Sequence, residues 1–159
     1  MTPAVRALEA AGVAFSVHEY EHDGGERDYG VEAVRRLGLD PDQVFKTLLV
    51  TGHGAASTAV VAVAVVPVST KLALKAAGAA LGVKRVELCD PAVAERVTGY
   101  VLGGISPFGQ RRALPTVIDE TCHLYDVVYV SGGRRGLDVG VAPSDLIRLL
   151  HATTAALTA

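Results

Sequence analysis

The longest apolar stretch of the sequence, residues 55–68, is the feature that most narrows what the chain can form. A helix that crosses a membrane needs about 20 consecutive apolar residues, and this stretch is shorter and is interrupted by two hydroxyl residues and Pro67. The stretch is rich in valine, which favours strands, and proline typically ends a strand. The sequence therefore predicts a long, buried strand over Ser57–Val66 rather than a membrane span.

Capping residues, glycine stops and alternating apolar residues predict the other elements. Helices are expected from Thr2-Pro3 to Gly12, over Val31–Leu37 and Lys71–Leu81, from Asp90-Pro91 to about Val97, and from Pro143 onward. Strands are expected over Phe15–Tyr20, Thr47–Thr51, Val86–Leu88, Thr116–Asp119, Val127–Ser131 and Leu137–Val141, with a hairpin turn at Gly52-His53-Gly54.

These helices and strands follow one another without the regular alternation of a doubly wound sheet, so the order predicts an α+β fold. The 159 residues contain no repeat or linker, and we expect one domain over residues 1–159. A hydrophobic content of 50% with 20% charged residues excludes a disordered chain. Aromatic residues make up only 5% of the chain, so the core must be mainly aliphatic.

Cysteine use and the first residues predict a reducing, cytoplasmic location. Cys89 and Cys122 form neither a C-x-x-C motif nor a disulfide framework, and we expect both to be packing residues. Glu9 and Gly12 fall where a signal peptide would have its apolar segment.

The string His18-Glu19-Tyr20-Glu21-His22 matches the zinc-binding H-E-x-x-H motif. That chemistry needs a helix, on which two histidines four residues apart share one face. The surrounding glycines and the alternation from Phe15 favour a strand, which would separate the two histidines by roughly 13 Å. The sequence therefore favours surface or hairpin histidines and predicts no metal site.

Charge is unevenly distributed along the chain. Residues 1–45 carry a net charge of −5, residues 46–112 carry +5, and residues 113–159 carry −2. The basic middle third could face an anionic partner or could simply be solvated. A total of −2 argues against strong non-specific binding of nucleic acid.

Three segments carry candidate chemistry. Lys46 stands at the mouth of an apolar strand, where it is either a cation of a site or an ordinary surface lysine. The glycine-rich segment 98–110 is either a tight structural loop or a nest of backbone N–H donors for an anion. In segment 129–139, Asp138 follows a doubly basic hairpin tip and faces either solvent or a pocket. Together they offer a cation, backbone donors, hydroxyls and a carboxylate, but no activated nucleophile.

The combination of motifs resembles the YbaK/EbsC type of Cys-tRNA(Pro) deacylase, related to the editing domain of bacterial prolyl-tRNA synthetases. The resemblance covers nearly the whole chain and rests on MTPAV at the start, HEYEHD at 18–23, LGLDPDQVFKTLLV at 37–50, TGYVLGGISPFGQRRALPTVID at 98–119 and VSGGRRGLD at 130–138. It implies a mixed, barrel-like β-sheet with flanking helices. It also implies a hydrolase that removes a wrongly attached amino acid from tRNA.

The resemblance also implies roles for individual residues. Lys46 matches a lysine that holds the phosphate or ribose of the terminal adenosine, and Gly103 and Gly104 match a loop lying against the aminoacyl group. Six further residues match positions in the pocket wall: Tyr20, Tyr29, Thr47, Ser106, Ser131 and Asp138. In the family reaction the thiol of the cysteinyl substrate attacks its own ester, so no cofactor, metal or enzyme nucleophile is expected.

The expected partners are the acceptor end of aminoacyl-tRNA and prolyl-tRNA synthetase. The tRNA could be guided by basic residues: Lys46, Lys71, Lys75, Lys84, Arg85, Arg111, Arg112, Arg134 and Arg135. Three alternatives stay open at this point. The chain could act on Ala-tRNA(Pro) or another small aminoacyl-tRNA. It could be a non-catalytic module that binds tRNA or a synthetase, or a metalloenzyme built on the histidine string. If it is a Cys-tRNA(Pro) deacylase, Cys-tRNA(Cys) could be a further substrate.

Overall fold

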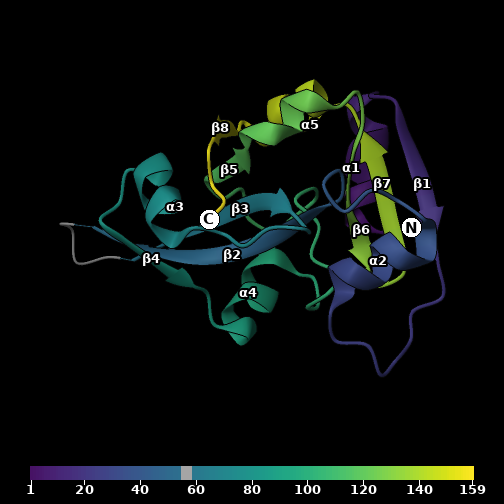
Figure 1. Cartoon of the computed structure of the whole chain (residues 1–159), viewed down its shortest axis with the longest axis horizontal. Helices are drawn as coiled ribbons and strands as arrows, with labels where there is room; N and C mark the ends of the chain where they lie inside the picture. The colour runs from purple at the N-terminus through teal and green to yellow at the C-terminus, as the bar shows by residue number, and fades with distance from the viewer. Residues whose placement is uncertain (55–58) are drawn as a thin grey trace.

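The computed structural model, which describes residues 1–54 and 59–159, contains two β-sheets flanked by helices. The smaller sheet has three antiparallel strands in the order β1 (Phe15–Glu19), β7 (Leu137–Val141) and β6 (Val128–Arg134). In Figure 1 this sheet stands across one end of the longer strands. The central strand β7 is buried along its whole length.

The larger sheet has five strands in the order β4 (Arg85–Leu88), β2 (Phe45–His53), β3 (Val60–Pro67), β5 (Thr116–Asp119) and β8 (Thr153–Ala155). β2 pairs antiparallel with both β3 and β4, whereas β5 pairs in parallel with β3 and β8. The predicted valine-rich strand is confirmed as β3 from Val60 onward. The first two residues of that prediction, positions 57 and 58, lie outside the described residues.

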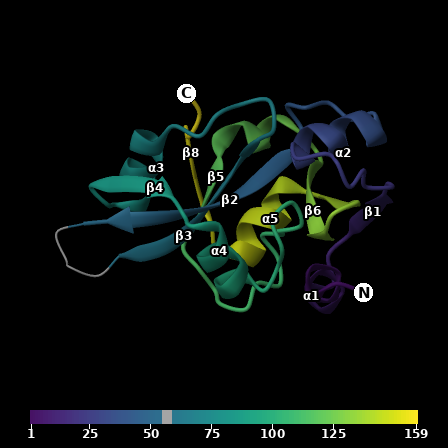
Figure 2. The same cartoon turned by 90° about the horizontal axis from the view of Figure 1, so that it is seen from below.

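The described residues form five α-helices and one 3₁₀ helix beside these sheets: α1 (Pro3–Ala11), α2 (Tyr29–Leu37), α3 (Leu74–Leu81), α4 (Pro91–Thr98), the 3₁₀ helix η1 (Glu120–Leu124) and α5 (Pro143–Leu150). The predicted caps are confirmed at the starts of α1 and α4. Thr2 accepts a hydrogen bond from the Val5 N–H, and Asp90 accepts one from the Ala92 N–H. Figure 2 shows α1 and α2 on opposite sides of the smaller sheet.

The predicted α+β class is confirmed, but the barrel-like part of the expectation needs correction. Within the described ranges the strands form two separate sheets and close no barrel. The sheets meet beside the start of β2, where Val44 forms a parallel bridge with Tyr129. The Gln43 side chain adds a hydrogen bond to the Val127 carbonyl, so this junction fixes β2 against β6.

The core is aliphatic, as predicted. Its largest cluster lies between the two sheets and includes Leu8, Phe45, Ile118, Val139 and Leu146, all at most 2% exposed. Outside residues 55–58, no helix combines the length and the apolar character that a membrane crossing requires.

Two local predictions were wrong for tertiary reasons. His53 is the last residue of β2 rather than part of a turn, because it pairs with Arg85 on β4. Residues 71–73 are not helical, because their backbone bonds to the chain end through Ala73 N–H to Leu157 O and Ala159 N–H to Lys71 O. β8 and η1 were not predicted.

Candidate active site

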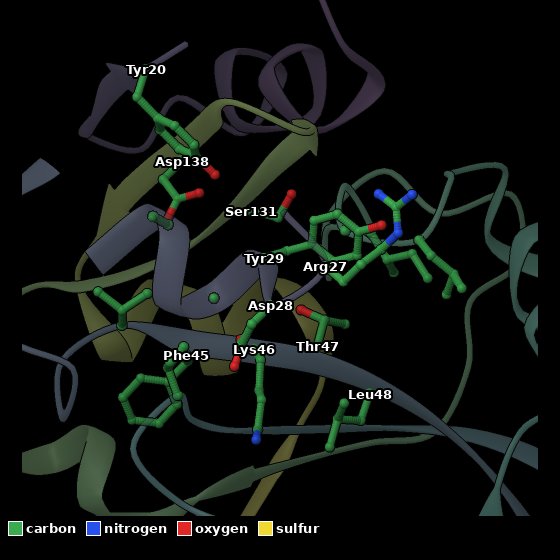
Figure 3. A pocket seen from close by; sticks show the side chains of 17 residues that line it. Tyr20, Arg27, Asp28, Tyr29, Phe45, Lys46, Thr47, Leu48, Ser131 and Asp138 are labelled. Carbon is green, nitrogen blue, oxygen red and sulfur yellow. The ribbon is translucent and has the colours of Figure 1, made fainter. Parts of the chain in front are cut away.

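A cavity of about 320 Å³ lies where the N-terminus of α2, the start of β2, the loop after α4 and the smaller sheet converge (Figure 3). This volume is at the lower end of the range for small-molecule sites. Seventeen residues line it: Tyr20, Arg27, Asp28, Tyr29, Gly30, Ala33, Val44, Phe45, Lys46, Thr47, Leu48, Val68, Leu102, Gly103, Ile105, Ser131 and Asp138.

The structure brings seven of the nine predicted site residues to this one cavity: Tyr20, Tyr29, Lys46, Thr47, Gly103, Ser131 and Asp138. They come from the residue after β1, from α2 and β2, from the loop after α4, and from β6 and β7, so only the fold brings them together. Gly104 and Ser106 do not line the cavity.

Lys46 lies on β2, one residue after the buried Phe45. Its ammonium donates a hydrogen bond to the Thr70 carbonyl at 2.8 Å. Partial burial lowers the pKa of Lys46 from its usual value; the charge of Asp28 opposes this effect, and Lys71 adds to it. In Figure 3 the side chain extends away from Ser131 and Asp138, so one end of the cavity is cationic.

The loop after α4 forms a tight turn over residues 101–104. The Gly104 N–H donates to the Val101 carbonyl at 2.9 Å, and Gly103 has a φ of +84°. A positive φ at the third turn residue alone defines a type II turn, which strongly favours glycine there. Within the described part of the chain, the N–H groups of Gly103 and Ile105 have no hydrogen-bond acceptor.

The Gly103 turn packs directly on the Tyr29 ring. A Cβ added to Gly103 would lie 2.6–2.7 Å from three atoms of that ring, so no larger residue fits without displacement. The Arg135 guanidinium lies 4.7 Å from the Tyr29 ring centroid, and its Nε donates to the Leu102 carbonyl at 2.8 Å. The turn, α2 and the β6–β7 hairpin are therefore fixed to one another through Tyr29.

Asp138 lies on β7 and is only 6% exposed, yet no hydrogen bond to its carboxyl group is found within the described residues. Burial raises the pKa of Asp138 to about 7. In Figure 3 the Tyr20 hydroxyl lies beside this carboxyl. Burial, together with the charge of Asp138, raises the pKa of Tyr20 to about 12. This end of the cavity thus holds a neutral hydroxyl and a carboxyl group that can change protonation near neutral pH.

Two hydroxyls complete the polar lining. The Thr47 Oγ1 is wholly hidden from solvent and has no hydrogen-bond partner; in the described ranges it is the one side-chain nitrogen or oxygen atom so completely covered that lacks a partner. A buried hydroxyl without a partner is unfavourable to the folded state. The Ser131 Oγ accepts a hydrogen bond from the Gly133 N–H at 3.2 Å.

Gly104 and Ser106 support the loop from behind. A Cβ at Gly104 would lie 2.8 Å from the Arg134 Cα, so glycine allows the loop to approach the hairpin. Ser106 is fully buried, and its Oγ accepts a hydrogen bond from the Phe108 N–H. Both residues therefore contact protein rather than the cavity.

Sequence reasoning missed Arg27 and Asp28, which line the cavity from the loop before α2. This loop is held by Glu32, a fully buried residue that bonds His22 Nδ1 at 2.6 Å and the Asp23 N–H at 2.8 Å. The only available sequence signal was a polar loop beside the matched motif at 18–23, which does not distinguish cavity residues from solvated ones.

The histidine string begins on a strand, as predicted. His18 on β1 contacts the Ser16 hydroxyl and the Tyr129 ring, whereas His22 contacts Glu32. In residues 1–54 and 59–159, no group of three or more His, Cys, Asp or Glu side chains is placed to hold a metal ion.

A model of the aminoacyl-tRNA editing domain matches residues 26–149, which include most of the cavity wall. The chain belongs to the aminoacyl-tRNA editing domain family. A member of this family acts on the ester bond between an amino acid and tRNA, and the chain is an aminoacyl-tRNA deacylase.

Two further comparisons agree with the family. The chain is 34% identical over 158 residues to a protein of Enterococcus faecalis named "Putative Cys-tRNA(Pro)/Cys-tRNA(Cys) deacylase EbsC", covering 99% of this chain and 93% of that protein. A crystal structure described as "a putative trans-editing enzyme for prolyl tRNA synthetase" superposes with a TM-score of 0.82 at 26% identity, covering 100% and 99% of the two chains. A hypothetical protein with a TM-score of 0.86 at 22% identity, covering 99% of each chain, shares the fold.

Proposed function

We propose that this deacylase acts in trans on mischarged Cys-tRNA(Pro), with Cys-tRNA(Cys) as a further substrate and prolyl-tRNA synthetase as the partner that supplies the tRNA. The observation that carries the proposal is the cavity itself, which has a cation at one end and a buried carboxyl group at the other. The name of the Enterococcus faecalis relative gives the same two substrates, and the description of the related crystal structure gives the same synthetase.

In this proposal the 3′ end of the tRNA enters with its charge toward Lys46. The Lys46 ammonium now bonds the Thr70 carbonyl, an acceptor that a phosphate or ribose oxygen can replace. Lys71 lies near enough to affect the pKa of Lys46 and adds positive charge on that side. The aminoacyl group then points toward Asp138, where the space is bounded by Tyr20 and Ser131.

Asp138 is suited to accept the proton of the substrate thiol. A free thiol has a pKa of about 8.5, and a base with a pKa near 7 is well matched to it at neutral pH. The thiolate sulfur attacks the ester carbonyl, the carbon–oxygen bond to the ribose breaks, and the ribose oxygen receives the proton from Asp138. The resulting four-membered thiolactone is opened by water to free cysteine.

Charge that develops on the ester oxygen needs hydrogen-bond donors. The N–H groups of Gly103 and Ile105 belong to cavity-lining residues and lack acceptors among the described residues. Such a donor typically contributes about 3 kcal/mol to transition-state stabilisation. The Gly104 N–H is already bonded within the turn, so we assign the donor role to Gly103 and Ile105.

The proposal needs no nucleophile from the enzyme. Neither Cys89 nor Cys122 lines the cavity. Cys122 is fully buried, and burial raises the pKa of its thiol to about 11, which keeps it protonated. A Cys89→Ser, Cys122→Ser double variant should therefore retain activity.

One observation favours a second substrate class, Ala-tRNA(Pro) or another small aminoacyl-tRNA. A carboxyl group with a pKa near 7 could equally take a proton from a water molecule that attacks the ester. In that case a substrate thiol would not be needed.

The deciding experiment compares tRNA(Pro) charged with cysteine, alanine or serine, and measures release of each amino acid. Fast release of cysteine with little release of serine supports the thiol mechanism, because serine differs from cysteine only at that atom. Equal rates on cysteine and serine would contradict it, and faster release of alanine would favour the second class. No release from any substrate would refute the deacylase itself.

The role of Lys46 is tested by Lys46→Ala. We expect the rate to fall a hundredfold or more, the usual effect of removing one group that clamps the transition state. Arg148→Gln is the matched control, since Arg148 is exposed on α5 and pairs with Asp145. A Lys46→Ala variant as active as this control would remove the assignment.

A further inference from the structure

The turn that presents the Gly103 N–H also presents a backbone carbonyl on its opposite side. Leu102 and Gly103 are joined by the central peptide of the type II turn at 101–104, and its two polar groups are the Leu102 carbonyl and the Gly103 N–H. They point in opposite directions, because a peptide unit is planar and trans. A group that binds the Leu102 carbonyl on one side of the turn therefore fixes the Gly103 N–H toward the other side.

The Leu102 carbonyl is held by Arg135. The Arg135 Nε donates to it at 2.8 Å, while the same guanidinium lies over the Tyr29 ring at 4.7 Å. On the preceding peptide, the Leu102 N–H donates to the Glu95 carboxylate at 2.8 Å. Both neighbouring peptides of Leu102 are thus anchored by charged side chains.

The alternative to a type II turn is a type I turn. The two have the same hydrogen bond between the first and fourth residues but opposite orientations of the central peptide. Type I is the commoner turn and is open to glycine, so Gly103 alone does not select type II. A donor fixed on the outer side, as Arg135 is, selects the orientation in which the Leu102 carbonyl faces it.

We propose that Arg135 is a positioning residue that fixes the Leu102–Gly103 peptide with the Gly103 N–H available to the substrate. The inference rests on the proposed function for the identity of that substrate. Arg135 also strengthens the Gly103 donor, because a hydrogen bond to the carbonyl of a peptide polarises the N–H of the same unit. Arg135 thereby acts through the peptide rather than by touching the reacting ester.

Its neighbour Arg134 provides the matched comparison. Arg134 is exposed and lies 3.5 Å from the Glu19 carboxylate, so it carries the same charge at the same hairpin without holding the turn. If Arg135 served only to attract tRNA phosphates, Arg134→Gln and Arg135→Gln would have similar effects on KM and on the salt dependence of activity.

The kinetic test measures kcat and KM on Cys-tRNA(Pro) for wild type, Arg134→Gln, Arg135→Gln and Arg135→Lys. We expect Arg135→Gln to lower kcat by about tenfold or more with KM nearly unchanged, the range typical of residues that orient a group in direct contact. Arg135→Lys, which can still donate to Leu102, should recover part of kcat. An unchanged kcat in Arg135→Gln, or a rise in KM that Arg134→Gln shares, would overturn the proposal.

A second measurement needs no tRNA. By nuclear magnetic resonance, a type II turn gives a strong Overhauser contact between the Leu102 Hα and the Gly103 amide proton, and a type I turn gives a weak one. We expect a strong contact in wild type and a weakened one in Arg135→Gln; an unaltered contact would refute the anchoring. If the wild-type protein releases no amino acid from any charged tRNA, the proposed function is wrong. The Overhauser contact then still tests whether Arg135 fixes the turn.

Discussion

Asp119 and Asp138 are two aspartates buried in the two sheets, at 1% and 6% exposure, with opposite surroundings. Asp119, at the end of β5, accepts hydrogen bonds from the Thr121 N–H, the Thr121 hydroxyl and the Leu157 N–H. Asp138, on β7, has none among the described residues and lines the cavity. A buried carboxylate with a complete set of donors stabilises the fold, whereas the carboxyl group without them is the one that meets the substrate in the proposed function.

The largest effect should come from removing the satisfied aspartate. Asp119→Ala leaves the Thr121 and Leu157 N–H groups buried without acceptors, and we expect a loss of about 3–5 kcal/mol in the free energy of unfolding. Denaturant unfolding measures this change. Activity per folded molecule should be unchanged, because Asp119 does not line the cavity. A loss of activity without a loss of stability would show that Asp119 serves the reaction rather than the fold.

Asp138→Asn should raise the free energy of unfolding above neutral pH, whereas Asp119→Ala should lower it. Burial raises the pKa of Asp138 from 3.8 to about 7, so its stabilising contribution is full below pH 3.8 and is lost as the pH rises through 7. At pH 8 the asparagine variant should therefore be more stable than wild type, by at most about 4 kcal/mol, and the difference should vanish near pH 4. Melting temperatures across this range test the sign.

The same variant tests catalysis. If Asp138 takes the thiol proton, kcat of wild type should rise with pH through about 7, and Asp138→Asn should lose both this limb and most of the rate. An active variant with the same pH profile would show that Asp138 is only part of the wall.

The comparison extends from carboxylates to the backbone. Gly103→Ala adds a Cβ 2.6–2.7 Å from the Tyr29 ring at a φ of +84°, so the turn must move and the free N–H moves with it. We expect a rate about a hundredfold lower, as for loss of one oxyanion donor. Gly38→Ala is the control, because Gly38 has a φ of +65° but nothing near its Cβ position. Equal losses in the two variants would indicate backbone strain alone.

Local signals in the sequence were enough to predict most elements. Thr2-Pro3 and Asp90-Pro91 start helices through contacts within four residues, so the signal and the structure lie together. Residues 71–73 were predicted helical because nothing local shows that the chain end pairs with them. The same applies to β8, which is three residues long and is a strand only because β5 lies beside it.

The candidate site shows the same division. The matched motifs predicted Lys46, Gly103 and Asp138, which all line the cavity. The motifs could not show that Ser106 faces the core. In a loop, tertiary packing decides which side chains point into the core and which into a cavity. They also gave no sign of Arg27, whose neighbours resemble an ordinary solvated loop.

The smallest expected effect concerns a hydroxyl. The Thr47 Oγ1 is buried without a partner, whereas the Thr116 Oγ1 donates to the Leu114 carbonyl at 3.0 Å. Thr47→Val keeps the shape and removes the unpaired oxygen, so we expect the free energy of unfolding to rise by about 1 kcal/mol. Thr116→Val should give no such gain. If the substrate bonds the Thr47 oxygen, Thr47→Val should also raise KM several-fold. A variant that is stabilised with unchanged KM would show that this hydroxyl does not contact the substrate.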